Sequence, residues 1–309
     1  MEKIEVIRYG DFEAKINLSR GANCISLRMN SFKILREPDY TFELDNPYVY
    51  GMPILFPVNR ISGGYFVFEG REYKFPINEA ETNCHLHGSL HQSEFVLTYK
   101  TDSRIICTYY SKADEPYSKA GNCYKVELEY ELNNDGFHQC VSIENMSDKN
   151  MPVMIGFHTT FNTLFAYGTP ESTFVYAGIE KEYERNVNNY LPTGNILEFD
   201  DVSKALANGV FKPFDMQASR HYKGLHKGKM VIYDSHNNLS IVYETDEKYK
   251  CRLIYNGGEY ICLEPQNCLV NCPNYSMGRE EAGFDFLKPG EIKKYYSKIS
   301  ICNQDKRPI

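Results

Sequence analysis

Alternation of apolar and polar residues with a period of two constrains the fold of this chain most strongly. In segment 12–18 every second residue is apolar and the residues between are charged or polar. Successive side chains of a β-strand point to opposite faces, so this pattern predicts a half-buried strand. The same pattern covers 126–132, and the Asn-Asn-Asp-Gly sequence at 133–136 predicts a hairpin turn into the next apolar stretch.

Strand patterns continue through the second half of the chain, at 230–233, 239–243, 252–255, 260–263 and 295–301. Only Asp201–Val210 has a helical pattern, with an Asp or Ser cap. The 25 tyrosines and 18 phenylalanines suit β-sheets. We find no repeat and no flexible linker. The sequence therefore predicts an all-β protein, a single domain over 1–309 that forms one large antiparallel β-sandwich with few short helices.

Composition narrows the choice of partners. With 42% hydrophobic and 24% charged residues, the chain has the composition of an ordinary globular protein. A formal net charge of -7 gives no broad positive surface, so we expect neither nucleic acid nor a membrane as partner. The first residues contain no apolar run of signal-peptide length, which predicts a cytoplasmic protein. The ten cysteines lack the spacing of a disulfide framework.

Four segments combine charged or imidazole side chains with rigid proline or glycine neighbours. In the first, the apolar, proline-containing run 51–58 ends in Asn59 and Arg60. A guanidinium carries five donors in a fixed fork, which suits it to binding sugar hydroxyls. The alternative is a surface arginine that is paired with a carboxylate.

The second segment contains His85, His87 and His91. On a strand, His85 and His87 share a face, a spacing that also occurs in metal sites of β-barrel enzymes. The next carboxylate is Glu94 and no second His-x-His follows, so a metal site is the less favoured interpretation. We expect His87 to hydrogen-bond a ligand or to be a structural histidine, and we expect no bound metal.

The third and fourth segments each hold one ionisable side chain in apolar surroundings. Burial lowers the pKa of a histidine and a nearby carboxylate raises it, so His158 is a candidate proton donor near neutral pH. Glu264 ends an apolar strand and precedes Pro265. Burying a carboxylate is costly without partners, which makes Glu264 the best candidate base. The alternatives are a core histidine bonded to a backbone carbonyl, and a glutamate neutralised by Arg252 or a lysine.

In this order the segments resemble the pattern of the aldose 1-epimerase (mutarotase) family: a proline-rich run to N-R-I, then H-G, then H-x-x-F-N, then E-P-Q. The matching positions are Asn59–Ile61, His87–Gly88, His158–Asn162 and Glu264–Gln266. The resemblance spans most of the chain. It implies the galactose mutarotase-like supersandwich, a large antiparallel β-sandwich with an open sugar-binding cleft, in agreement with the strand pattern.

The resemblance also implies an activity, the interconversion of the α and β anomers of a hexose or related sugar. The implied general base is Glu264 and the implied general acid is His158. The implied substrate ligands are Arg60, His87, Asn59 and Gln266. Ring opening and closure need one acid and one base, so no metal or other cofactor is implied. The expected partner is a small sugar, and the expected assembly is a monomer or a homodimer.

One departure from the family pattern concerns the substrate. The family's additional aspartate, in a D-x-x-F segment, has no clear counterpart, and the corresponding stretch 219–229 is rich in cations. We expect a solvated loop there. Alternatively, His221, Lys223 and Lys227 face an anionic sugar, such as a phosphorylated or acidic hexose. A non-catalytic carbohydrate-binding or sensing module and a metal-dependent β-barrel enzyme remain alternatives, although the absence of tryptophan argues against a polysaccharide platform.

Overall fold

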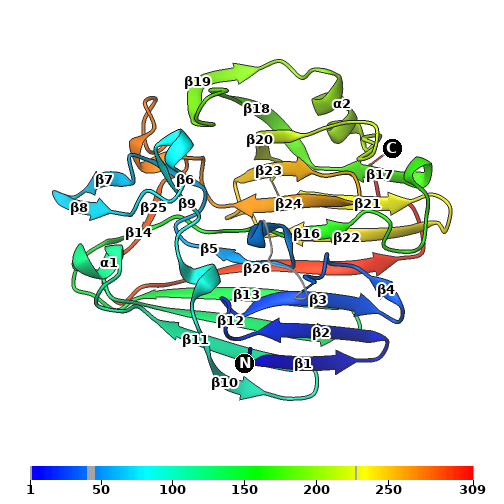
Figure 1. The fold of residues 1–309 in the computed structure, drawn as a ribbon, viewed down its shortest axis with the longest axis horizontal. Coiled ribbons are helices and arrows are strands. Elements are labelled where there is room, and N and C mark those ends of the chain that lie inside the picture. Colours follow the sequence, from blue (N-terminus) through cyan, green and yellow to red (C-terminus); the bar gives the residue numbers. More distant parts are fainter. Residues whose placement is uncertain (1, 40–45, 227, 309) are drawn as a thin grey trace.

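β-strands dominate the computed structural model, which describes residues 2–39, 46–226 and 228–308 (Figure 1). One eight-stranded sheet, called here the first sheet, has the order β10 (Val96–Lys100), β11 (Arg104–Tyr110), β12 (Tyr124–Asn133), β13 (Gly136–Asn145), β26 (Ile292–Cys302), β22 (Leu239–Thr245), β21 (Lys229–Asp234) and β17 (Thr173–Tyr176). The second sheet contains, in order, β19 (Pro192–Leu197), β18 (Ile179–Arg185), β20 (Ser219–Gly224), β23 (Cys251–Asn256), β24 (Tyr260–Gln266), β15 (Gly156–Phe157) and β5 (Ile54–Leu55), and β16 (Thr160–Asn162) also pairs with β24.

Smaller sheets extend this framework. A four-stranded sheet consists of β1 (Ile4–Tyr9), β2 (Phe12–Asn17), β3 (Asn23–Met29) and β4 (Phe32–Lys33). Three strand pairs follow: β6 (Arg60–Ser62) with β9 (Cys84–Leu86), β7 (Tyr65–Phe68) with β8 (Arg71–Lys74), and β14 (Met151–Val153) with β25 (Asp285–Leu287). The α-helices in the described part of the chain are α1 (Pro116–Lys119) and α2 (Asp201–Asn208). None of the described helices is long and apolar enough to cross a membrane.

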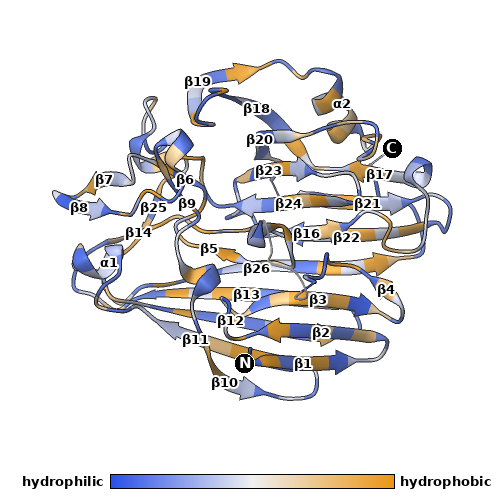
Figure 2. Cartoon of the chain, viewed as in Figure 1, coloured by the Kyte–Doolittle hydropathy of each residue, from blue (hydrophilic) through white to orange (hydrophobic). Residues whose placement is uncertain are grey.

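The predicted hairpin is present, because β12 and β13 pair along their whole lengths. The side chains of β12 alternate between buried and partly exposed, as the period of two requires. Figure 2 shows the resulting mixture of hydrophobic and hydrophilic residues along single strands such as β2 and β3. The buried side chains, among them Leu128 and Val141, belong to one hydrophobic cluster that extends in sequence from Ile7 to Ile299.

The two large sheets contact each other across this cluster. The ring of Tyr243, on β22 of the first sheet, lies 5.5 Å from the ring of Phe161, on β16 of the second sheet. The Tyr243 hydroxyl is 3.0 Å from Oγ1 of Thr159. The antiparallel β-sandwich predicted from the sequence is therefore confirmed. This contact also fixes the position of Thr159, the residue that follows His158 in the chain.

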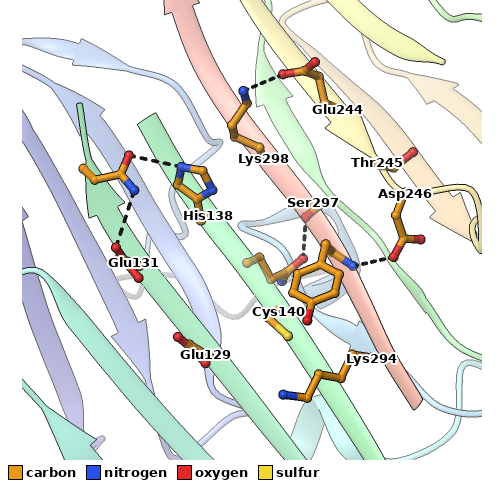
Figure 3. A pocket seen from close by; sticks show the side chains of 13 residues that line it. Glu129, Glu131, His138, Cys140, Glu244, Thr245, Asp246, Lys294, Ser297 and Lys298 are labelled. Atoms are coloured by element: carbon orange, nitrogen blue, oxygen red, sulfur yellow. Dashed lines mark hydrogen bonds and ion pairs between the residues drawn. The ribbon is translucent and has the colours of Figure 1, made fainter. Parts of the chain in front are cut away.

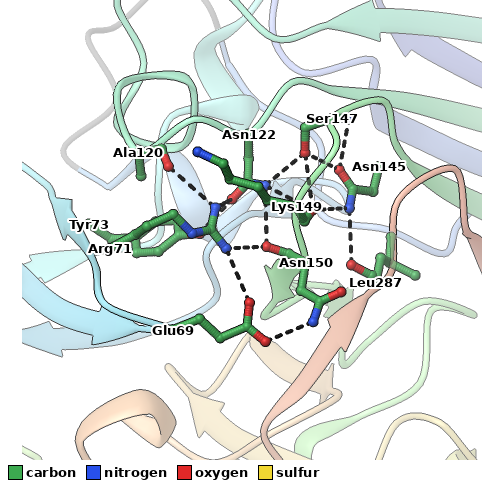
Figure 4. Close-up of polar contacts among 10 residues, drawn as sticks. All are labelled: Glu69, Arg71, Tyr73, Ala120, Asn122, Asn145, Ser147, Lys149, Asn150 and Leu287. Carbon is green, nitrogen blue, oxygen red and sulfur yellow. Dashed lines mark hydrogen bonds and ion pairs between the residues drawn. The ribbon is translucent and has the colours of Figure 1, made fainter.

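A polar cluster attaches the β7–β8 hairpin to the end of the first sheet (Figure 4). The fully buried Asn122 donates to Oγ of Ser147 at 2.8 Å and accepts from Nη1 of Arg71 at 3.0 Å. Nη1 of Arg71 also donates to the backbone oxygen of Ala120 at 3.3 Å. Buried polar groups are stable when they are hydrogen-bonded, so the cluster holds β8 in place. The hairpin lies in the chain between β6 and β9, which carry two of the predicted site segments.

The predicted helix is also confirmed. It begins after Asp200, whose Oδ1 accepts the backbone N–H of Ser203 at 3.0 Å as an N-cap. It ends at Gly209, which has the left-handed φ of 72° that favours glycine.

The prediction of a solvated loop at 219–229 is wrong for its first part, since Ser219–Gly224 forms β20 inside the second sheet. The cationic side chains of this segment are typical of a solvated loop. In the fold, Arg220 and Lys223 have acidic partners, which a local pattern does not show. Arg220 pairs with Glu182 at 3.0 Å and with Asp200 at 2.7 Å. Lys223 pairs with Glu180 at 3.2 Å. These ion pairs allow a charged sequence to occupy the middle of a sheet.

Candidate active site

His158 and Glu264 lie opposite each other in the second sheet. The segments before and after His158, β15 and β16, both pair antiparallel with β24. Gly156 is paired with Gln266 and Thr160 with Cys262, so this register places position 158 level with position 264. Nε2 of His158 is 3.2 Å from Oε1 of Glu264. The fold thus brings together the two side chains that are implied to be acid and base.

Both side chains line a cavity of about 510 Å³. This volume is within the range of ~300–1,000 Å³ that is typical of small-molecule sites. Besides His158 and Glu264, the lining consists of Asn46, Pro47, Tyr48, Asn59, Arg60, Glu79, Glu81, Leu86, His87, Arg185, Tyr190, Ser219, Leu253 and Tyr255. Three of the predicted substrate ligands, Asn59, Arg60 and His87, are therefore in the cavity wall. Gln266 is not.

The carboxyl group of Glu264 is almost completely removed from solvent, with 1% of the residue exposed. Its Oε2 accepts a hydrogen bond from Nε2 of Gln266 at 3.3 Å, whereas Oε1 has no hydrogen-bond donor among the described residues. Burial raises the pKa of Glu264 to about 8, although the Gln266 hydrogen bond and the charges of Arg185 and Arg60 act in the opposite direction. The group therefore takes up a proton far more readily than an exposed glutamate.

His158 experiences the opposite shift. It is buried, and removal from water lowers its pKa to about 4. Its backbone N–H donates to the backbone oxygen of Pro53 at 3.1 Å, which ties the segment to the neighbouring strand region. Because the pKa of the imidazole falls to about 4 and that of Glu264 rises to about 8, the pair carries one proton across the neutral range.

His87 lies beside this pair in an unusual backbone conformation. Its φ is 67°, in the left-handed region, and its N–H donates to the backbone oxygen of Asn59 at 3.1 Å. Its ring packs 4.6 Å from the ring of Tyr48 and 5.8 Å from that of His158, measured between centroids. Burial is the main reason that the pKa of His87 lies well below its usual value, so the imidazole is neutral.

Gly88 allows this turn to approach the neighbouring strand. A Cβ atom at Gly88 would lie 1.9 Å from the backbone oxygen of Phe56, and φ is 63°. No other residue type fits there without moving the backbone. The His87–Gly88 pair is thus held close to the proline-containing run that leads to Arg60.

Arg60 has the carboxylate partner that the alternative interpretation anticipated, yet it remains in the cavity wall. Its Nε and Nη2 donate to the two carboxylate oxygens of Glu79, each at 2.6 Å. Its guanidinium carbon lies 4.7 Å from the ring centroid of Tyr190. The ion pair lowers the pKa of Glu79 against the effect of burial. The guanidinium is thereby fixed in one orientation, with Nη1 left without a protein acceptor among the described residues.

Asn59 and Gln266 form a chain that leads to Glu264. Nδ2 of Asn59 donates to Oε1 of Gln266 at 3.4 Å, and the Gln266 amide in turn donates to Glu264. Gln266 is fully buried and does not line the cavity. This position suits orientation of Glu264 better than contact with a sugar.

The three histidines of the second segment do not come together. His85, His87 and His91 line three different cavities. β9 ends at Leu86 and His87 has a positive φ, so His85 and His87 do not continue one strand. His85 instead bonds through Nδ1 to the backbone oxygen of Pro76 at 2.7 Å. The described residues include no group of three or more His, Cys, Asp or Glu side chains that could hold a metal ion.

His221 and Lys223, the described cations proposed from segment 219–229, do not line the cavity either. His221 is fully buried, and burial lowers its pKa to about 3. Lys223 is paired with Glu180 on the surface of the sheet. Lys227 lies outside the described residues. From this stretch only Ser219 reaches the cavity wall.

Sequence reasoning missed several lining residues, above all Tyr48, Arg185 and Tyr190. Tyr48 belongs to a 3-10 turn, Pro47–Val49, and its ring packs on those of His87 and His91. Arg185 ends β18, a strand in which five of the seven residues are charged, so nothing local distinguishes it. The pairing of β18 with β20 and of β20 with β23 brings it to the site, and such long-range pairing has no motif.

A second concave region lies on the outer face of the first sheet (Figure 3). Its volume is about 550 Å³, and strands β12, β13, β22 and β26 contribute most of its lining. None of the predicted site residues is there. One ion pair in its lining joins Lys298 and Glu244 at 2.9 Å. The described chain therefore concentrates its candidate chemistry in the cavity with His158 and Glu264.

Comparison with known proteins identifies the family of the chain. Residues 3–300 match the model of the aldose 1-epimerase family. The match covers nearly the whole sequence, and the chain belongs to the aldose 1-epimerase family. This membership supports a role as a sugar epimerase, and it fits the acid and base geometry described above.

Solved structures show the same fold. A galactose mutarotase-like protein from Clostridium acetobutylicum is 29% identical, with a TM-score of 0.90 over 98% of this chain and 99% of that one. A galactose mutarotase-like protein from Lactobacillus casei is 19% identical, with a TM-score of 0.76 over 97% of this chain and 100% of that one. A galactose 1-epimerase from Lactobacillus acidophilus is 13% identical, with a TM-score of 0.69 over 99% and 100%. The two more distant structures are similar in fold alone.

Proposed function

We propose that this protein interconverts the α and β anomers of a hexose or related sugar, with Glu264 as general base and His158 as general acid. The observation that carries the proposal is the 3.2 Å approach of the two side chains in the wall of one cavity. General acid–base catalysis requires groups within hydrogen-bond reach of the atoms that exchange protons, and each such group contributes about 10²–10⁴ in rate. The two shifted pKa values are typical of such sites.

The reaction balances with these two groups. Glu264 removes the proton from the C1 hydroxyl while His158 protonates the ring oxygen, and the bond between C1 and the ring oxygen breaks. Rotation about the C1–C2 bond turns the other face of the aldehyde towards the C5 hydroxyl. Closure then returns a proton to C1–O from Glu264 and takes the proton of the C5 hydroxyl back to His158. The protein is regenerated, so no cofactor is consumed.

The number of protons that His158 and Glu264 hold together is consistent with this cycle. The cycle needs one proton on the acid and none on the base, so the pair must hold a single proton. Opposite shifts by burial leave a single proton on the pair between about pH 4 and about pH 8 and place it on Glu264 in the free protein, so it must move to His158 before the ring opens. The proton belongs to the pair as a coupled unit, and bound substrate determines which member carries it at each step.

Arg60, His87 and Asn59 are proposed to bind sugar hydroxyls. The Glu79 ion pair occupies two of the three nitrogens of Arg60, which leaves Nη1 for the ligand. The neutral imidazole of His87 can donate with one nitrogen and accept with the other. Gln266 is proposed to act through Glu264, since it contacts the carboxylate and not the cavity.

We further propose that the protein acts in the cytoplasm as a single-domain monomer or homodimer on a freely diffusing sugar. One chain supplies the acid, the base and the hydroxyl ligands, so the reaction needs no nucleic acid, membrane or protein partner. Glu264 is on β24, and His158 lies between β15 and β16, which both pair with β24, so one molecule supplies both side chains.

The test is the rate of anomer exchange, measured by NMR magnetisation transfer or polarimetry on glucose and galactose. The wild-type protein should accelerate the exchange of at least one common aldose or aldose phosphate by several orders of magnitude. Absence of acceleration for all of them would overturn the catalytic proposal. Calorimetric binding of a sugar without acceleration would instead identify a non-catalytic carbohydrate-binding module.

A further inference from the structure

Arg185 contributes a second cation to the cavity that contains Glu264. It is the last residue of β18, and β18 is separated from β24 by β20 and β23. Two intervening strands correspond to a backbone separation of ~14 Å, at ~4.8 Å per strand. Nη2 of Arg185 donates to the backbone oxygen and to Oγ of Ser219, a cavity residue on β20. A ligand that contacts Glu264 and His158 at one end can therefore contact Arg185 at another.

Among the described residues, Arg185 has no carboxylate partner, whereas Arg60 has one. No described carboxylate oxygen lies within salt-bridge distance of Arg185, and its Nε and Nη1 have no described acceptor. Arg60, in the same cavity, makes two 2.6 Å bonds to Glu79. Both guanidinium groups contact the ring of Tyr190, at 4.7 Å for Arg60 and 5.7 Å for Arg185. Two cations thus share one aromatic residue, and in the described part of the chain Arg60 alone of the two has a counter-ion.

The acidic residues of the lining do not supply the missing charge. Glu79 is fully engaged by Arg60, and Glu81 is exposed to solvent. Glu264 is largely protonated at neutral pH, because burial raises its pKa to about 8. Arg185 itself stays charged, although burial and the charge of Arg60 lower its pKa to about 10. Arg185 is partly shielded from solvent, and an anionic ligand would stabilise a cation in such a position.

We propose that the substrate of this site is a sugar that carries an acidic group, a carboxylate or a phosphate, and that Arg185 binds this group. The planar guanidinium fork matches the oxygens of both groups, and charge-assisted bonds of this kind are about twice as strong as neutral ones. Arg185 thereby replaces His221 and Lys223, the cations suggested by the sequence, which the fold buries or pairs. The inference rests on the proposed epimerase function and specifies its substrate class.

The experiment compares matched sugars that differ in the acidic group alone: glucose, glucuronate and glucose 6-phosphate. Anomer exchange is measured for the wild type, Arg185→Gln, Arg185→Lys and Lys223→Gln. We expect the wild-type kcat/KM to be at least tenfold higher for one acidic sugar than for glucose. Arg185→Gln should reduce that ratio by tenfold or more, mainly through KM, and Arg185→Lys should restore part of it. The control Lys223→Gln, a nearby cation outside the cavity, should keep the wild-type ratio.

The outcomes separate this inference from the proposed function. Preference for glucuronate over glucose 6-phosphate, or the reverse, identifies the anion as a carboxylate or a phosphate. Preference of the wild type for glucose, or equal losses on all three sugars in Arg185→Gln, would refute the inference while the epimerase function stands. If the protein accelerates the exchange of none of these sugars, calorimetry with wild type and Arg185→Gln tests the inference. The wild type must bind an acidic sugar more tightly than glucose, and Arg185→Gln must lose that difference.

Discussion

Gln266 donates a hydrogen bond from Nε2 to Oε2 of Glu264 at 3.3 Å, and this is the one hydrogen bond that the carboxylate accepts from described residues. The two residues are two positions apart on β24, so their side chains leave the strand on the same face. Asn59 fixes the other end of the amide. The proposed base is thus oriented by its own strand, and this hydrogen bond to the ionised form lowers the pKa of Glu264 against the larger effect of burial.

Replacement of Gln266 by Leu removes this donor. We expect kcat to fall by roughly tenfold, because a mispositioned base loses part of its catalytic contribution. The alkaline limb of the pH profile should move to higher pH, because the hydrogen bond that lowers the pKa of Glu264 is lost. Gln139→Leu is a matched control, since Gln139 is also buried but belongs to the first sheet. An unshifted limb in Gln266→Leu would mean that Gln266 is purely structural.

The pH dependence of wild-type activity should be bell-shaped. As pH falls through about 4, the pair takes up a second proton and no base remains. As pH rises through about 8, the pair loses its last proton and no acid remains. The values of kcat/KM report the free enzyme, so they should decline on both sides of this window. A profile that rises steadily from pH 6 to pH 10 would disagree with a single shared proton.

Burial of Glu264 should also make the protein less stable at alkaline pH. Its folded-state pKa of about 8 exceeds the ordinary value. The destabilisation by the ionised group is therefore absent in acid and grows as the pH rises to about 8. Glu264→Gln removes the titration. The Tm of this variant minus that of the wild type should therefore increase between pH 5 and pH 8.5. Each kcal/mol of stability that the wild type loses corresponds to ~2–4 °C. Glu81→Gln, at an exposed position of the same cavity, serves as the control, and an equal trend there would contradict the explanation.

Gly88 should tolerate no larger residue. Gly88→Ala places a Cβ 1.9 Å from the backbone oxygen of Phe56, so we expect a loss of several kcal/mol or failure to fold. Gly70→Ala is the matched control, because Gly70 has a similar φ of 73° but nothing within 4 Å of the added atom. It should cost only the left-handed strain of ~1–2 kcal/mol. Urea unfolding measures both, and equal losses would show that backbone strain alone matters.

The parts of the fold that the sequence predicts are those encoded by neighbouring residues. The β12–β13 hairpin and α2 are encoded by residues within or directly beside them, and both are confirmed. Segment 219–224 was misinterpreted because its charges find partners on other elements, among them Glu182 on β18. Ion pairs across a sheet leave no local pattern, so such a strand resembles a loop.

The candidate site divides in the same way. His158 and Glu264 belong to short motifs, and the resemblance to the family pointed to them before any geometry was known. Arg185 and Tyr48 have no motif, because they reach the cavity through the pairing of β18 and the turn at Pro47–Val49. The pairing of distant strands places Arg185 beside Arg60 and Tyr190, with no counter-ion among the described residues.

The most direct test of the account is a double-mutant cycle of anomer exchange for wild type, Glu264→Gln, His158→Asn and the double variant. If base and acid act as one proton-sharing unit, either single variant should lose about as much rate as the double variant, as for other catalytic groups that act together. Each loss should reach 10²-fold or more. Single variants that retain near wild-type rates, or losses that simply add in free energy, would contradict a paired mechanism at His158 and Glu264.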